Sequence, residues 1–70
     1  MITVLTFEQN TKLGYKVRSL RISLRLTQSE LADAVGVTLD EVDLFEHDLP
    51  VRPDVKRRLL RELWARRALR

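Results

Sequence analysis

The apolar residues that follow Asn10 recur with the period of an α-helix. They are spaced by four, three and four residues and so share one stripe of a helix: Leu13, Val17, Leu20 and Leu24. We therefore expect a helix from about Thr11 to Leu24, with one apolar face turned toward a core.

Two capping boxes predict two further helices. Thr27 is followed three residues later by Glu30, and Thr38 is followed in the same way by Glu41. In such a box each residue's side chain satisfies the other's backbone amide, which fixes the first turn of a helix. Gly36 lies between the boxes and indicates a tight turn. The expected helices are Gln28–Val35 and Leu39 to about His47.

Two prolines then interrupt the chain. Pro50 and Pro53 lie three positions apart, which forbids a continuous helix through them. Pro53 suits a first helical position, and Asp54 suits the positive end of the helix dipole. Because no glycine or proline follows, we expect a last helix from about Asp54 to Leu69.

The first ten residues have a different pattern. Ile2–Phe7 is β-branched and aromatic, as in a short strand, but no second strand-like run could pair with it. The sequence thus predicts an N-terminal arm or strand in residues 1–10 and an all-α bundle of four helices in residues 11–70. The arm is a floppy tail, lies extended on the helices, or pairs as a strand with a second copy.

Composition narrows the function. A chain of 70 residues has a marginal core, and without cysteine it has no disulfide to support that core. Dimerisation or unusually good helix packing must supply the missing stability, and we expect a homodimer. His47 is the single histidine, and no phosphate-binding glycine loop or nucleophile motif is present. We therefore expect no enzyme, no metal and no cofactor. No long apolar run is present, which predicts a cytoplasmic protein without a membrane partner.

The charges are strongly segregated along the chain. The net charge of +3 combines a basic segment, residues 11–25, which carries +5, with a basic C-terminal segment, residues 52–70, which carries +6. Between them, residues 26–51 carry −7 and contain no lysine or arginine. A polyanionic partner would be attracted to the flanking segments and repelled by the middle one.

Together these features resemble the phage repressor/Cro-type (Xre-like) helix-turn-helix family, over about Leu13–Leu63. The family pattern has an arginine in the first helix, a Thr-Gln-x-Glu-Leu-Ala segment, a Gly-Val turn, an aliphatic residue and a closing glutamate. The matching residues are Arg21, Thr27, Gln28, Glu30, Leu31, Ala32, Gly36, Val37, Val42 and Glu46. The resemblance implies a DNA-binding transcriptional regulator that acts as a dimer.

The resemblance also implies roles for single residues. It makes Arg21 and Glu46 a buried ion pair between the first and third helices. It places Gln28, Thr38 and Arg52 against the DNA backbone, with Arg18 or Arg25 of the first helix as further cations. The third helix would lie in the major groove, with its base-contacting positions at Leu39, Asp40 and Leu44.

Those base-contacting positions depart from the usual chemistry. Base edges are generally contacted by Arg, Lys, Asn or Gln, whereas here two leucines and an aspartate occupy the positions. An apolar pair ringed by acids suits a protein surface, so a second hypothesis is an interaction module that docks a protein partner through Leu39 and Leu44. A third is that the basic face of the last helix contacts nucleic acid instead.

Two more departures concern the loop and the last helix. Asp48 stands where the family commonly has a glycine in a left-handed turn, a conformation that Asp tolerates. The family's fifth helix is missing, which leaves an apolar row on the last helix at Leu60, Trp64 and Ala68. We expect the arm or a second subunit to cover that row.

Overall fold

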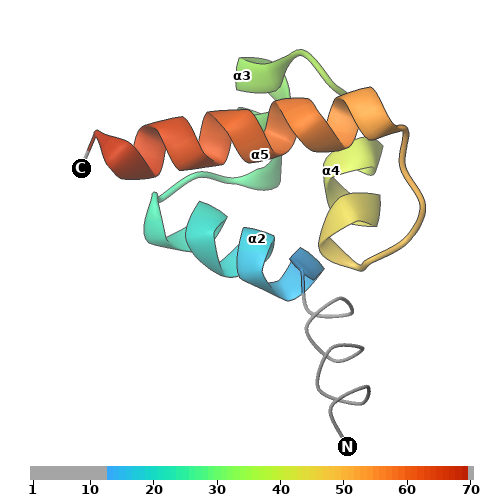
Figure 1. Cartoon of the computed structure of the whole chain (residues 1–70), viewed down its shortest axis with the longest axis horizontal. Coiled ribbons are helices and arrows are strands. Elements are labelled where there is room, and N and C mark those ends of the chain that lie inside the picture. The colour runs from blue at the N-terminus through green and yellow to red at the C-terminus, as the bar shows by residue number, and fades with distance from the viewer. Residues whose placement is uncertain (1–12, 70) are drawn as a thin grey trace, which may run out of the picture.

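The computed structural model describes residues 13–69, and over this range the chain is all-α with four helices and no strand (Figure 1). The helices are α2 (Leu13–Ser23), α3 (Gln28–Val35), α4 (Leu39–Glu46) and α5 (Pro53–Ala68). The prediction for α3 is confirmed at both ends. Helix α4 ends one residue earlier than predicted, with His47 as its C-cap. Helix α5 begins one residue earlier, at Pro53, and ends one residue earlier, with Leu69 as its C-cap. The predicted arm, residues 1–10, lies outside the described residues.

Both capping boxes are confirmed. The Thr27 hydroxyl accepts from the Glu30 amide at 3.0 Å, and the Glu30 carboxylate accepts from the Thr27 amide at 2.8 Å. The corresponding distances at Thr38 and Glu41 are 3.1 and 2.9 Å. Gly36 ends α3 in the left-handed conformation, with φ of 82°. The α3–turn–α4 unit is thus fixed mainly by residues close together in sequence.

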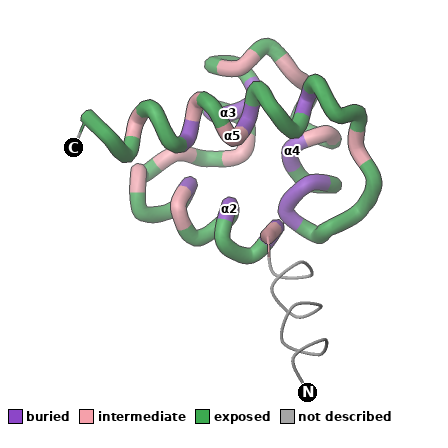
Figure 2. The backbone as a smooth tube through the Cα atoms, viewed as in Figure 1, coloured by how far each residue is buried: buried purple, intermediate pink, exposed green. Residues whose placement is uncertain are grey.

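The core lies where the four helices meet, and Figure 2 shows the buried positions turned toward it. Helix α5 lies across the other three helices and contacts each of them (Figure 1). The core side chains are those that the helical period selects: Val17, Leu31, Ala32, Val42, Phe45, Val55, Leu59 and Leu63. Removing apolar side chains from water is the main stabilising term for such a bundle.

Helix α2 closely approaches the end of α4. A Cβ added to Gly14 would lie 2.5 Å from the Glu46 carbonyl oxygen and 2.7 Å from that of Phe45. The Gly14 amide donates a hydrogen bond of 2.9 Å to the Asp48 carboxylate. Asp48 has φ of 59°, so the left-handed turn predicted there is present and its side chain also ties the turn to α2.

The predicted apolar row on α5 is not covered by residues 13–69. Leu60 is half-buried, Trp64 is 45% exposed and Ala68 is exposed. A shallow apolar groove runs here between the start of α2 and α5, lined by Leu13, Leu60 and Trp64 with two arginines, Arg57 and Arg61. As far as residues 13–69 are concerned, this groove is open to an apolar segment.

Candidate nucleic-acid interface

A buried ion pair ties α2 to α4. Arg21 donates from Nε to Oε2 of Glu46 at 2.5 Å and from Nη2 to Oε1 at 3.1 Å. Its remaining nitrogen, Nη1, donates to the Leu26 carbonyl at 2.8 Å. Both residues are buried, and each charge is compensated by the other, as buried charges require. The pair expected from the resemblance is therefore present, and it fixes the C-terminal end of α4 against α2.

The positions that the resemblance assigns to base contact all lie on the surface of α4. Leu39 is 49% exposed, Leu44 is 36% exposed, and Asp40 is also exposed. Leu49, just after the helix, is a third exposed leucine that the sequence analysis does not single out. The surface of α4 therefore combines apolar side chains with carboxylates and contains no lysine or arginine.

Gln28, at the first position of α3, faces carboxylates. Its side-chain nitrogen donates to Asp43 at 3.2 Å and to Glu46 at 3.1 Å. A glutamine amide has two N–H donors, so both are already occupied within the protein. Gln28 would have to give up one of these bonds to donate to a phosphate.

Arg52 and Thr38 meet at Glu41. The Thr38 hydroxyl accepts from the Glu41 amide, and the Arg52 guanidinium donates from Nη2 to Glu41 Oε2 at 3.1 Å. The backbone amide of Thr38 lowers the pKa of the Glu41 carboxyl, and Arg52 lowers it further. Glu41 is thus held ionised between a helix cap and an arginine whose side chain is itself 71% exposed.

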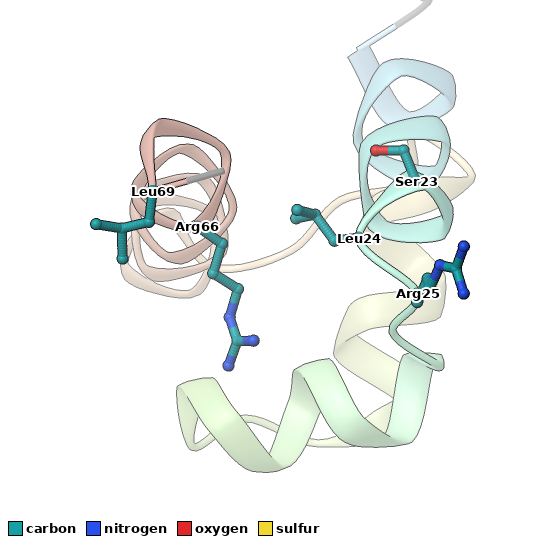
Figure 3. A pocket seen from close by; sticks show the side chains of 5 residues that line it. All are labelled: Ser23, Leu24, Arg25, Arg66 and Leu69. Atoms are coloured by element: carbon teal, nitrogen blue, oxygen red, sulfur yellow. The ribbon is translucent and has the colours of Figure 1, made fainter.

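The other predicted cations lie on α2 and just after it. Arg18 lines a surface hollow together with Gln28, beside the start of α3. Arg25 is exposed in the turn after α2, with φ of 62°. Figure 3 shows its side chain directed away from α5, whereas Leu24 faces α5 and Arg66 extends toward the space between the helices. Arg18 therefore shares its hollow with the carboxylates of Asp43 and Glu46, whereas Arg25 does not line that hollow.

Apart from the Arg21–Glu46 pair, sequence reasoning missed the side-chain hydrogen bonds that cross between elements. These are the Gln28–Asp43 and Gln28–Glu46 hydrogen bonds, the Arg52–Glu41 ion pair and the Gly14–Asp48 hydrogen bond. Their partners lie 11 to 34 residues apart, so no local spacing signals them. Only the Gly14–Asp48 contact had a signal in the sequence. Gly14 is a glycine inside a helical pattern, which can indicate close packing of the helix against a neighbour.

Within residues 13–69, no three His, Asp or Glu side chains gather in a way that could hold a metal ion. The helices of this range are too short or too polar to cross a membrane. No protein-family model, curated protein or solved structure matches this chain.

Proposed function

We propose that this protein is a DNA-binding transcriptional regulator of the repressor/Cro type, acting in the cytoplasm. The observation that carries the proposal is the placement of α4. The buried Arg21–Glu46 pair fixes this helix against α2, and the capping box at Thr38 fixes its first turn. Leu39, Asp40 and Leu44 stay exposed on it, as a helix that enters the major groove requires.

In this proposal the flanking cations supply most of the affinity. Phosphate contacts by Lys and Arg release counterions and provide the sequence-independent part of DNA binding. Those cations are Arg18 and Arg25 beside α3, with Arg52 at the start of α5. On α4, Leu39 and Leu44 contact thymine methyl groups and Asp40 accepts from cytosine, which are the contacts open to such side chains.

The proposal includes a homodimer, because repressor/Cro-type proteins bind two half-sites related by a two-fold axis. The supporting observation is the groove on α5, where Trp64 stays 45% exposed beside Leu60. A second copy that covers this groove would bury apolar surface that residues 13–69 leave in water.

A titration against random duplex DNA at low and moderate salt tests the proposal. Binding that weakens steeply with salt, and that Arg18→Ala weakens further, is the expected result. A matched control is Arg67→Ala, which removes the same charge from an exposed position near the end of α5. The absence of any duplex binding at low salt would reject the proposal.

A second candidate function is protein docking, which the exposed leucines favour. Leu39, Leu44 and Leu49 lie among carboxylates, so the fitting partner is a basic peptide with apolar side chains. Leu44→Lys separates the two functions, because an added cation strengthens DNA binding but disrupts docking of a basic peptide. Selection from a random peptide display library, compared between wild type and Leu44→Lys, measures the second effect.

A further inference from the structure

Arg52, which the proposed function assigns to the DNA backbone, and Gln28, to which the family resemblance gives the same role, are both held by carboxylates of α4. Arg52 donates to Glu41 at 3.1 Å, and Gln28 donates to Asp43 at 3.2 Å and to Glu46 at 3.1 Å. A carboxylate resembles a phosphate to such donors, since both present acceptor oxygens with negative charge. Gln28 precedes α4 in the sequence, in α3, and Arg52 follows α4, at the N-cap of α5.

We infer that Glu41 is an internal competitor for DNA phosphate, which occupies Arg52 in the free protein and must release it when DNA binds. The inference rests on the proposed function. It assigns to Glu41 a role beyond the capping box, and it makes a residue that contacts no DNA a determinant of affinity. Asp43 acts in the same direction on Gln28, although Gln28 carries no charge and so contributes less.

The geometry allows the exchange. Glu41 uses separate oxygens for its two tasks: Oε1 accepts from the Thr38 amide and Oε2 accepts from Arg52. Releasing Arg52 therefore leaves the helix cap intact. The Arg52 side chain is largely exposed and lies at the N-cap of α5, so it can turn toward a ligand without disturbing the core.

The variant Glu41→Gln separates the two tasks. Glutamine still accepts a hydrogen bond from the Thr38 amide, as glutamate does in a capping box. It has no negative charge, however, so it no longer forms an ion pair with Arg52. Glu30→Gln is the matched control. It makes the same substitution at the same position of the other capping box, which has no arginine partner among the contacts of residues 13–69. Both variants gain one unit of net charge.

Equilibrium binding to a random duplex is then measured for wild type, both single variants, Arg52→Gln and the double variant Glu41→Gln/Arg52→Gln. Exposed ion pairs are weak, so we expect Glu41→Gln to tighten binding about two- to fivefold more than Glu30→Gln does. Because only the excess gain passes through Arg52, Glu41→Gln in the Arg52→Gln background should tighten binding no more than Glu30→Gln does in wild type.

Four results would overturn the inference. If Glu41→Gln and Glu30→Gln tighten binding equally, or if the excess gain of Glu41→Gln persists in the Arg52→Gln background, Glu41 acts only as a general negative charge. The ion pair also has a readout without DNA: in an NMR titration, Arg52→Gln should raise the pKa of the Glu41 carboxyl, and an unchanged pKa would show that the pair does not form in solution. If neither wild type nor any variant binds duplex DNA at low salt, the proposed function fails, and the inference fails with it.

Discussion

The guanidinium of Arg21 and the carboxylate of Glu46 meet through two hydrogen bonds, although 25 residues separate them in the chain. The contact joins α2 to the last residue of α4, and Gln28 of α3 donates to the same carboxylate. Three helices therefore converge on Glu46. Its charge is acceptable in a small core only because these donors surround it.

Replacing Arg21 with alanine should destabilise the fold strongly. The change leaves the Glu46 carboxylate buried without its cation, which typically costs about 3–5 kcal/mol of unfolding free energy. That is a large share of the stability of so small a domain. Urea denaturation followed by circular dichroism measures the loss. Arg18→Ala, on the exposed side of the same helix, should change stability by less than about 0.5 kcal/mol. Equal stabilities for the two variants would contradict the role of the pair.

Gly14→Ala should also destabilise the protein, for a steric reason. The added methyl group would lie 2.5 Å from the Glu46 carbonyl oxygen, so α2 must move away from α4. Overpacking of this kind costs about 1–3 kcal/mol, and here the clash is with backbone, which yields little. Gly36→Ala provides the comparison, because no atom lies within 4 Å of its added Cβ and only the positive φ opposes it. A Gly14→Ala variant as stable as wild type would refute the close approach.

If the chain binds DNA, the flanking arginines should control affinity and its salt dependence. Each phosphate contact removed, as in Arg18→Ala, should lower the magnitude of the salt slope by about one. Asp40→Asn should instead strengthen non-specific binding, since it deletes a negative charge from exposed α4. Fluorescence anisotropy over a range of salt concentrations measures both effects. If Asp40→Asn abolishes binding while Arg18→Ala binds normally, α4 contacts bases directly and the charge argument is wrong.

Arg25→Gly should raise stability while it weakens DNA binding. Arg25 has φ of 62°, a conformation that costs a residue with a Cβ about 1–2 kcal/mol, whereas glycine adopts it freely. After the extra chain entropy of glycine, the net gain should be about 0.5–1 kcal/mol. Arg25→Ala removes the same charge but keeps the strain, so it should weaken binding without stabilising the fold. Thermal melting measures the stability of both variants, and fluorescence anisotropy measures their binding to DNA. For Arg25→Gly, stability should rise and DNA affinity should fall.

The fluorescence of Trp64 should show whether a second copy of the chain covers the groove on α5. It is the single tryptophan of the chain and is 45% exposed within residues 13–69. A homodimer that covers it should sediment at about twice the 8.2 kDa of one chain at tens of micromolar, and its emission should shift to the red on dilution. A species of 8.2 kDa whose emission shifts only when residues 1–10 are deleted would show instead that the arm covers the groove of its own chain.

The sequence by itself determines the helices and most of the core, because these depend on residues near one another in the chain. A threonine and a glutamate three positions apart are sufficient to start α3 and α4. The period of the apolar residues then selects the face that becomes buried, including Val17, Leu59 and Leu63. The resemblance of the motif also identifies Arg21 and Glu46 as a pair, which local spacing could not.

Only the tertiary structure decides how the surface charges are paired. Glu41 meets Arg52, and Asp43 meets Gln28, because of the way in which α3, α4 and the loop before α5 come together. Gly14 is needed because α2 passes so close to the carbonyl oxygens at the end of α4. Exposed side chains have many partners within reach in an unfolded chain, so sequence spacing cannot select among them. The packed core selects them, since it fixes which helix ends lie side by side.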